Sequence, residues 1–348
     1  MRILVQGSLI LAVAAVVRAP SARVRGSETA SLQTPLNVES PLVTPAPPVP
    51  APRTDAVVFV VLDGARWQEV LVGSDPKFAV GDDRDMTAEA TMPNLHRMID
   101  EGAVIGAPDH GAAMVASGPN FVSLPGYTEI FSGRTPFGCA DNDCPATRQA
   151  TIADEVRATS TDVAVFSSWA PIARAASMRP SEIVHSTGEV GTGAFRADRA
   201  TADKGLAYYA EHRPSFFFLG LGEPDEFAHK GDYTGYMGSL RQADAVLGEL
   251  RRLLAQMGER GRSTSVFVTC DHGRSDNFQD HGWPWPESQR VWLVAAGGAI
   301  PARGVVDASR KHRLADIVPT VRVLLDLPPD LSSGAGSPIE ELLPSPSR

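Results

Sequence analysis

Three unbroken apolar runs in this chain are each followed by acidic or histidine residues, and this pattern constrains the fold more than any other feature. The runs and the residues after them are 56–62 with Asp63, 215–221 with Asp225 and His229, and 265–269 with Asp271 and His272. An apolar run without polar alternation is typical of a strand buried on both faces of a parallel sheet. Because the carboxyl ends of parallel strands lie at one edge of the sheet, the sequence predicts that these polar side chains converge there.

Strands and helices alternate along the rest of the chain. Residues 163–166 and 291–295 are further strand candidates, and helical patterns cover residues 92–102, 151–159 and 236–256. Alternation of this kind predicts an α/β fold, here a three-layer sandwich with a mostly parallel central sheet. With 348 residues, of which 43% are hydrophobic, the chain can bury a large core without a disulfide scaffold.

The first 54 residues differ in composition from the rest of the chain. Residues 1–22 combine a basic start, an interrupted apolar stretch and small residues, which predicts a secretory signal peptide. A buried first strand or helix is the alternative, and the stretch is too short for a good membrane span. Residues 23–54 are rich in Pro, Ser, Thr and Ala and predict a disordered tether. We therefore expect a periplasmic or secreted protein with its catalytic domain in residues 55–348 and no transmembrane span beyond the signal peptide.

The charge of the chain bears on its partners. The formal net charge is −9, and no block of Lys or Arg is present. A nucleic-acid groove needs a basic stripe, so we expect a small-molecule substrate and no nucleic-acid partner. The acidic charge also disfavours electrostatic capture of polyanions, although a bound metal ion would supply positive charge locally. The sequence leaves the oligomeric state open.

Two further spacings indicate a metal site. Asp225 and His229 lie four positions apart, so on a helical turn they share one face and could bind one cation. A surface Asp/His pair in a loop gives the same spacing. Asp271 and His272 stand together at the end of a core strand, where each needs a partner, and His281 follows nine positions later. Carboxylate and imidazole ligands favour zinc, with manganese, iron or calcium as alternatives.

Asp63 and Ser123 are less specific when each is considered alone. An Asp before Gly is common in turns and at helix N-caps, which is the alternative role for Asp63. Ser123 precedes Pro125-Gly126 and an apolar-leaning stretch, which fits a serine at the mouth of a helix, where free N–H groups favour anions. A plain Ser N-cap fits the same pattern. The nearby hydroxyls of Thr128 and Ser132 fall later in the expected helix.

Taken together, these segments resemble the alkaline phosphatase superfamily, and within it the type I phosphodiesterase/nucleotide pyrophosphatase branch. The resemblance covers residues 57–328, and its motifs follow the order of the family. They are Asp63-Gly64 after the first strand, a nucleophile stretch that ends Ser132-Gly133-x-x-Pro136, Pro224-Asp225-x-x-x-His229-x-Gly231, Asp271-His272-Gly273, His281-Gly282, and residues 314–320 before a closing helix. Each motif is weak alone, and their shared order makes the resemblance specific.

The resemblance implies a site for two divalent ions, with zinc favoured. One ion would be held by Asp63, Ser123, Asp271 and His272, and the other by Asp225, His229 and His281. Coordination of Ser123 to a metal would lower the pKa of its hydroxyl and make it a nucleophile. A covalent phosphoserine would follow, and water would hydrolyse it. The expected activity is therefore metal-dependent hydrolysis of a phosphoester, as in phosphatases and phosphodiesterases.

Differences between this chain and the family motifs favour some alternative activities and disfavour others. Sulfatases of the superfamily carry C/S-x-P-x-R, whereas this chain has Tyr127 in the Arg position, which disfavours a sulfatase. Some secreted monoesterases carry Lys-x-Arg where this chain reads Ser167-Ser168-Trp169, which favours diesters over monoester dianions. A phosphomutase or phosphonate hydrolase could use the same ligands. An inactive metal-stabilised binding protein is disfavoured by the presence of Ser123 beside a complete ligand set.

The cysteines fit an exported protein. Cys139 and Cys144 flank Asn142, and such a pair can form a disulfide in an oxidising compartment, with two unrelated thiols as the alternative. Asn142 lies near the place where the superfamily carries a phosphate-binding Asn, so the resemblance implies a catalytic role for it. Cys270, at the end of a strand, is expected to be a buried thiol.

Overall fold

The computed structural model describes residues 53–159, 162–188 and 195–345. The predicted signal peptide, residues 1–22, lies outside the described residues, as does nearly all of the predicted tether, residues 23–54. Within the described part of the chain, no helix is both long enough and apolar enough to cross a membrane.

The core of the fold is an eight-stranded sheet. In spatial order its strands are β10 (Gly304–Val305), β2 (Ala103–Ile105), β9 (Leu293–Gly297), β7 (Thr264–Thr269), β1 (Ala56–Leu62), β6 (Phe216–Leu221), β4 (Val163–Ser167) and β5 (Val184–Thr187). Seven of the strands run parallel, and β9 pairs antiparallel with both β7 and β2. The prediction of a mostly parallel central sheet is confirmed.

A second, three-stranded sheet shows where one strand prediction was wrong. Its strands are β11 (His312–Arg313), β3 (Met114–Val115) and β8 (Arg290–Val291). The sequence favoured a single strand over residues 291–295, but the chain passes from β8 in this sheet to β9 in the large sheet at Trp292. The buried Trp292 indole donates to the Ala65 carbonyl at 3.0 Å, and its own carbonyl accepts from the Thr269 hydroxyl at 2.5 Å. The Trp292 carbonyl therefore bonds to a side chain where a continuous strand would bond to its neighbour.

The helices include those that the sequence pattern predicted and others that it did not. They are α1 (Trp67–Leu71), α2 (Ala88–Thr91), α3 (Pro93–Glu101), α4 (Ser123–Ser132), α5 (Ile152–Thr159), α6 (Ala173–Ala176), α7 (Asp198–His212), α8 (Glu223–His229), α9 (Tyr233–Gln256), α10 (Glu259–Arg262) and α11 (Ile317–Leu324). The expected helices at 92–102, 151–159 and 236–256 correspond to α3, α5 and α9. Helix α9 begins three residues early because the Asp232 carboxylate accepts from the backbone N–H of Gly235 at 2.8 Å.

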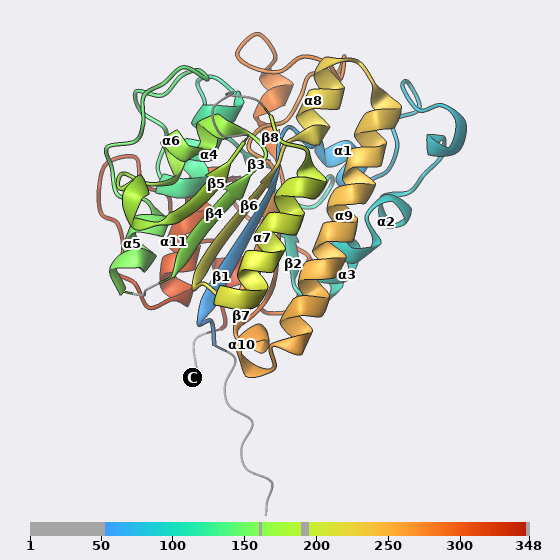
Figure 1. The fold of residues 1–348 in the computed structure, drawn as a ribbon. Helices are drawn as coiled ribbons and strands as arrows, with labels where there is room; N and C mark the ends of the chain where they lie inside the picture. The colour runs from blue at the N-terminus through green and yellow to red at the C-terminus, as the bar shows by residue number, and fades with distance from the viewer. Residues whose placement is uncertain (1–52, 160–161, 189–194, 346–348) are drawn as a thin grey trace, which may run out of the picture. The chain divides into compact units, whose positions relative to one another are not determined.

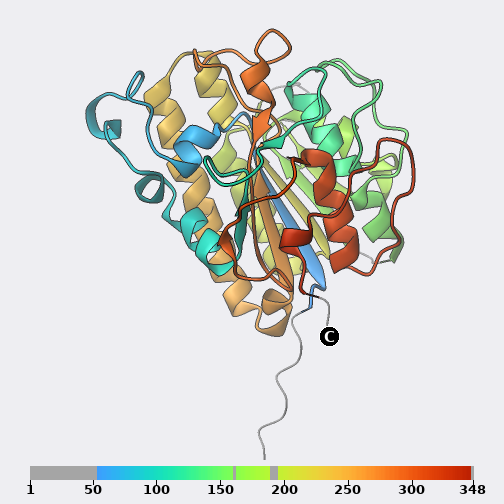
Figure 2. The same cartoon turned by 180° about the vertical axis from the view of Figure 1, so that it is seen from behind.

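Strand β6 explains why the apolar runs are unbroken. Successive side chains of a strand point to opposite faces of the sheet. Phe217 packs against Tyr209 of α7 with ring centroids 5.0 Å apart, whereas Phe218 packs against Phe131 of α4 at 4.5 Å. Helices α7 and α9 cover one face of the sheet (Figure 1), and α11 covers the other (Figure 2). Both faces of β6 are therefore buried, and the three-layer sandwich is confirmed.

The carboxyl ends of the central parallel strands meet at one edge of the sheet, the upper edge in Figure 1. Strands β1, β6 and β7 are neighbours there, in the register Leu62 with Leu221 and Val61 with Thr269. The polar residues that follow these three strands are consequently brought together, as the sequence pattern predicted.

Candidate metal centre and nucleophile

The first group of candidate ligands follows β1 and β7. Asp63, Asp271 and His272 are buried, and one ligand atom from each lies within 4.8 Å of the others. His272 Nε2 is 3.5 Å from both Asp63 Oδ1 and Asp271 Oδ2. Asp63 follows β1 directly, and it does not cap a helix, since the N-cap residue of α1 is Arg66.

The second group comes from α8 and from the loop after β7. Asp225 and His229 share one face of α8, as their spacing predicted, with Asp225 Oδ2 3.1 Å from His229 Nε2. His281 Nε2 lies 3.0 Å from His229 Nε2 and 3.7 Å from Asp225 Oδ1. The two groups adjoin, because Asp225 Oδ1 is also 3.9 Å from His272 Nε2.

Backbone carbonyls orient two of the three imidazoles. His272 Nδ1 lies 2.9 Å from the Gly273 carbonyl, and His281 Nδ1 lies 3.1 Å from the Phe121 carbonyl. Because a carbonyl only accepts hydrogen bonds, each Nδ1 carries the proton and each Nε2 keeps its lone pair. Burial lowers the pKa of His272 to about 4 and that of His281 to about 3, so both rings are neutral at neutral pH. Neutral rings with a free Nε2 are suited to metal coordination.

Ionisation is unfavourable for two of the three carboxylates in the protein without bound metal. Burial, together with the nearby Asp225 charge, raises the pKa of Asp63 to about 7. Burial and the Asp63 charge raise the pKa of Asp271 well above its usual range. Burial also opposes ionisation of Asp225, but the Arg274 guanidinium and the His229 hydrogen bond hold its pKa well below the usual range. Buried carboxylates crowded in this way are typical of positions that share a cation.

These residues fit divalent metal ions. Asp271 Oδ2 is buried and has no hydrogen-bond partner among the described residues, which leaves a strong acceptor without a donor. A tetrahedral zinc site with bonds of roughly 2.0–2.2 Å separates its ligands by about 3.3–3.6 Å. The separations of 3.0–3.9 Å within and between the two groups are close to that range. The donor set of carboxylates and imidazoles is the one that zinc prefers.

Ser123 stands beside the first group. Its Oγ lies 3.3 Å from Asp63 Oδ1 and 3.3 Å from His272 Nε2. It is the first residue of α4, and because Val122 occupies the N-cap position, the alternative role of Ser123 as a plain N-cap is wrong. The rival hydroxyls point elsewhere, with Thr128 Oγ1 donating to the Leu124 carbonyl at 2.8 Å and Ser132 Oγ to the Arg134 carbonyl at 3.4 Å.

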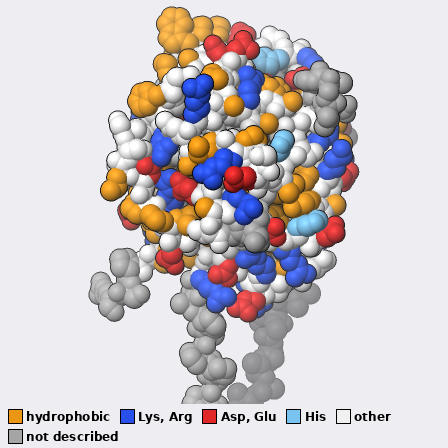
Figure 3. Space-filling model, turned by 60° about the vertical axis from the view of Figure 1, so that its left-hand side comes forward, with side chains coloured by type: hydrophobic (Ala, Val, Ile, Leu, Met, Phe, Trp, Pro, Cys, Tyr) orange, Lys and Arg blue, Asp and Glu red, His pale blue; other side chains and the backbone are white. Residues whose placement is uncertain are grey.

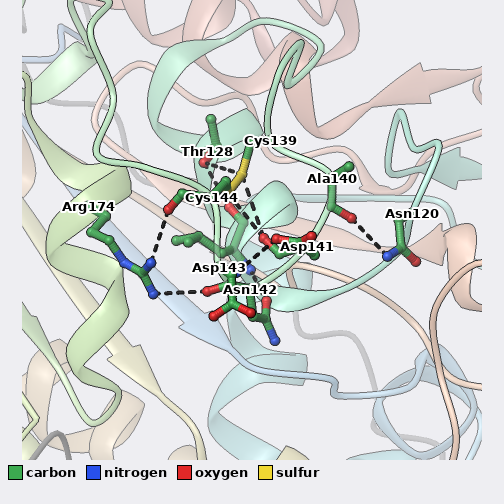
Figure 4. The surroundings of a disulfide bond; sticks show 10 residues. Asn120, Thr128, Cys139, Ala140, Asp141, Asn142, Asp143, Cys144 and Arg174 are labelled. Carbon is green, nitrogen blue, oxygen red and sulfur yellow. Dashed lines mark hydrogen bonds between the residues drawn. A yellow bond between two sulfur atoms is a disulfide. The ribbon is translucent and has the colours of Figure 1, made fainter.

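Asn142 is presented by a disulfide-closed loop. Cys139 and Cys144 are bonded to each other, and Arg174 donates to the carbonyls of Asn142 at 2.9 Å and of Cys144 at 3.0 Å (Figure 4). The Asn142 side-chain oxygen accepts from the Leu124 N–H at 2.9 Å, which places its amide beside the start of α4. The remaining cysteine, Cys270, is a buried free thiol, as predicted.

A comparison with protein-family models places the chain. The model of the metalloenzyme superfamily matches residues 17–329, which is most of the sequence and all of the candidate ligands. The chain belongs to the metalloenzyme superfamily. This confirms the resemblance to the alkaline phosphatase superfamily, and it makes the protein an enzyme of that superfamily that binds divalent metal.

Some proteins resemble this metalloenzyme over part of its sequence, and others resemble it in fold. The 2,3-bisphosphoglycerate-independent phosphoglycerate mutase of Rippkaea orientalis is 30% identical over 121 residues, which are 33% of this chain and 22% of the mutase. The chain thus matches about a quarter of the length of the curated relatives. The solved structure of the phosphonate monoester hydrolase of Agrobacterium radiobacter matches with a TM-score of 0.57 and 15% identity. The match covers 85% of this chain and 79% of the hydrolase chain. Murine ectonucleotide pyrophosphatase/phosphodiesterase 5 has a TM-score of 0.54 and 12% identity, covering 81% and 97%. At these identities the solved structures show the shared fold alone.

A cavity of about 210 Å³ opens beside Ser123 in this metalloenzyme. Its lining consists of Asp63, Ser123, Asn142, Trp169, Phe195, Gly222, Asp225, Glu226 and His229. The cavity therefore joins the candidate nucleophile, the amide of Asn142 and ligands of both groups. Trp169 forms part of the wall.

Three residues that the sequence interpretation missed support the metalloenzyme centre. The buried Tyr127 donates its hydroxyl to Asp63 Oδ2 at 3.1 Å. Asp198 accepts from the N–H groups of Gly222 and Glu223 at 2.8 and 2.9 Å and so anchors the start of α8. Arg274 contacts Asp225 directly. An Arg directly after Asp271-His272-Gly273 was a visible signal for the third, whereas no local pattern marks Tyr127 or Asp198.

Proposed function

We propose that this metalloenzyme hydrolyses phosphoric esters, with Ser123 as the nucleophile and two zinc ions as cofactors, and that it prefers diesters. The observation that carries the proposal is the position of Ser123 Oγ, 3.3 Å from one ligand atom each of Asp63 and His272, at the start of a helix. A hydroxyl in that position can coordinate the metal ion that Asp63, Asp271 and His272 would bind. The free N–H groups at the start of α4 favour an anionic phosphoryl group beside it.

Ser123, Asn142 and the metal ligands would each have a separate role in the reaction. When bound, the ions would lower the pKa of the Ser123 hydroxyl and neutralise charge on the phosphoryl oxygens. Ser123 Oγ, having lost its proton to solvent, forms a bond to phosphorus while the bond from phosphorus to the leaving oxygen breaks, and the leaving oxygen takes up a proton from solvent. The Asn142 amide, held by its bond from the Leu124 N–H, is in position to donate to a phosphoryl oxygen. Water then cleaves the phosphoserine, and Oγ regains a proton.

The charge of the cavity supports a diester. Of the described residues that line it, none is Lys or Arg, and beyond the proposed metal ligands Asp63 and Asp225 the lining contains the acidic Glu226. A phosphate monoester carries up to two negative charges at neutral pH, because its second pKa is about 6, whereas a diester carries one. A dianion would thus lack the cationic side chain that some relatives supply where Trp169 stands. On the face shown in Figure 3, basic and acidic side chains are interleaved.

A panel of chromogenic substrates tests the proposal. We expect zinc-loaded protein to release p-nitrophenol from bis(p-nitrophenyl) phosphate with a higher kcat/KM than from p-nitrophenyl phosphate, and least from p-nitrophenyl sulfate. A higher value for the monoester would overturn the diester preference and leave the hydrolase class intact. Turnover of the sulfate alone would overturn the class.

Phosphoryl transfer to a second hydroxyl is the other candidate, and the matches to phosphoglycerate mutases favour it. A mutase and a hydrolase both form the phosphoserine and differ in the acceptor that removes it. Turnover in ¹⁸O-labelled water separates them, because a hydrolase incorporates ¹⁸O into the released phosphoryl product (a phosphate monoester when the substrate is a diester) and a mutase does not.

Export from the cytoplasm remains part of the proposal. The Cys139–Cys144 bond supports it, since disulfides persist in oxidising compartments. We expect protein purified from the native host to lack about the first twenty residues, as cleaved signal peptides do. Recovery of intact Met1 on cytosolic protein would contradict export.

A further inference from the structure

Arg274 is buried at the boundary between the two groups of candidate ligands. Its side chain is among the least exposed of the charged residues, with 2% of its surface accessible. It follows the segment Asp271-His272-Gly273 and begins the loop that ends at His281. A cation buried beside candidate metal ligands carries an electrostatic cost, because it repels any metal ion that binds there.

Three hydrogen bonds engage all three nitrogens of the Arg274 guanidinium. Nε donates to the Phe278 carbonyl at 2.6 Å, Nη2 donates to the Gln279 carbonyl, and Nη1 donates to Asp225 Oδ1. Two of the acceptors belong to the loop that carries His281, and the third is on α8. The planar guanidinium therefore joins the two segments that supply the second group of ligands.

The backbone around this contact accommodates it. Phe278, whose carbonyl accepts from Arg274, has φ 71°, an uncommon conformation for a side chain other than Gly, and its ring is buried. Gly64 lies against the ion pair, and a Cβ at that position would stand 2.6 Å from Asp225 Oδ1 and 2.7 Å from Arg274 Nη1. A glycine after Asp63 is thus required for Asp225 and Arg274 to meet.

The contact with Arg274 also gives the two oxygens of Asp225 different partners. Oδ1 accepts from Arg274, whereas Oδ2 faces His229 Nε2 at 3.1 Å. His281 lies on the loop whose carbonyls accept from Arg274, and its Nε2 is 3.7 Å from Asp225 Oδ1. The Arg274 guanidinium therefore contacts both the Asp225 carboxylate and the loop that carries the His281 imidazole.

From these contacts we propose that Arg274 is a positioning residue: it presents Asp225 to a metal ion through Oδ2 alone and sets the loop so that His281 completes the group. The proposal rests on the proposed function for the existence of the second metal ion. It assigns no contact between Arg274 and substrate.

Charge and geometry predict opposite effects of replacing Arg274, which makes the proposal testable. If Arg274 acted only as a nearby positive charge, Arg274→Gln would tighten metal binding by removing repulsion. If it positions Asp225 and His281, Arg274→Gln weakens binding of one ion by about 10- to 100-fold, as loss of a residue that orients metal ligands does. Arg274→Lys keeps the charge but lacks the planar fork, so we expect it to weaken binding similarly.

The experiment is calorimetric titration of zinc into metal-free protein, for the wild type and for Arg274→Gln and Arg274→Lys. Arg322→Lys is the matched control, since Arg322 is 3% exposed, ion-paired with Glu155, and on α11. His281→Ala identifies which of the two binding events belongs to the second group. Cobalt-substituted protein gives a second readout, because its visible spectrum reports the coordination of the ion. Thermal unfolding of the metal-free variants shows whether each one folds.

We expect only the event that His281→Ala removes to weaken in both Arg274 variants, with an altered cobalt spectrum and an unchanged Arg322→Lys. Tighter or unchanged zinc binding in Arg274→Gln overturns the proposal, as does wild-type binding in Arg274→Lys. If Arg274→Gln does not fold, the Lys variant alone decides. Failure of the proposed function is distinct: a wild type that binds two ions but cleaves no phosphoester refutes the function and leaves the role of Arg274 standing.

Discussion

His229 Nε2 and His281 Nε2 lie 3.0 Å apart, although one belongs to α8 and the other to the loop after β7. His281 donates from Nδ1 to the Phe121 carbonyl, so its Nε2 has no proton to offer. Two imidazole nitrogens at this separation, with Asp225 Oδ2 3.1 Å from one of them, form three corners of a coordination site.

We predict that His281→Ala reduces the zinc content from about two ions to about one, because tetrahedral zinc sites need three or more protein ligands. Mass spectrometry under native conditions counts the ions directly. His185→Ala, a change on the exposed edge strand β5, is the control and should retain both ions. Two tightly bound ions in His281→Ala would contradict the assignment of His281.

We predict that Ser123→Ala lowers kcat by at least about 10³-fold, as deletion of other covalent nucleophiles does. Folding and zinc content should change little, since one small hydroxyl is removed and Asp63, Asp271 and His272 remain. Thr128→Ala is the matched control, because its hydroxyl donates to the Leu124 carbonyl. Steady-state kinetics on all three proteins decides, and full activity in Ser123→Ala would refute the nucleophile.

Asn142→Ala should lower kcat/KM by about 10²- to 10³-fold, the usual effect of removing one preorganised donor to a developing charge. Zinc content should stay the same. Asp143→Ala alters an exposed neighbour in the same disulfide-closed loop and should be close to wild type. An equal loss in both variants would assign the effect to the loop and not to the Asn142 amide, and wild-type kinetics in Asn142→Ala would refute its role.

Asp198→Ala should destabilise the protein by about 1–3 kcal/mol, the cost of leaving buried donors unpaired. The carboxylate accepts from Ser168 Oγ at 2.5 Å and from two backbone N–H groups at the start of α8. Urea unfolding measures the change, with the exposed Asp203→Ala on α7 as the control. No loss of stability in Asp198→Ala would show that α8 needs no such anchor.

Stability of the metal-free protein should fall as pH rises from 5 to 8. Burial raises the pKa of Glu129 from 4.5 to about 7, even though Ser117 and the Ala315 N–H donate to it. The folded protein thus binds a proton that the unfolded chain has released, so this contribution is complete below 4.5 and lost as pH passes 7. Its size is on the order of 3 kcal/mol. Glu129→Gln does not titrate, and urea unfolding at both pH values should show a shallower decline. If the wild type and Glu129→Gln lose the same stability between the two pH values, Glu129 does not cause the pH dependence.

Local patterns were sufficient for the elements and for short-range placement. The run AVVFVVL predicted β1 residue for residue, because a strand covered on both faces must be apolar at every position. The spacing of Asp225 and His229 predicted that they share a face of α8, since four residues make about one helical turn. The position of Ser123 at the start of a helix followed from the residues after it.

Contacts between distant segments were decided only by the tertiary structure. No periodicity relates Arg274 to Asp225, or the Phe121 carbonyl to the ring of His281, and these contacts exist because the sheet sets the places of the loops. The split of residues 291–295 between two sheets at Trp292 is of the same kind, because it depends on an acceptor at Ala65 and a donor at Thr269. Sequence determines which side chains are available and which face of their own element they share. Which oxygen of a carboxylate, or which nitrogen of an imidazole, stays free for a metal depends on partners supplied by packing.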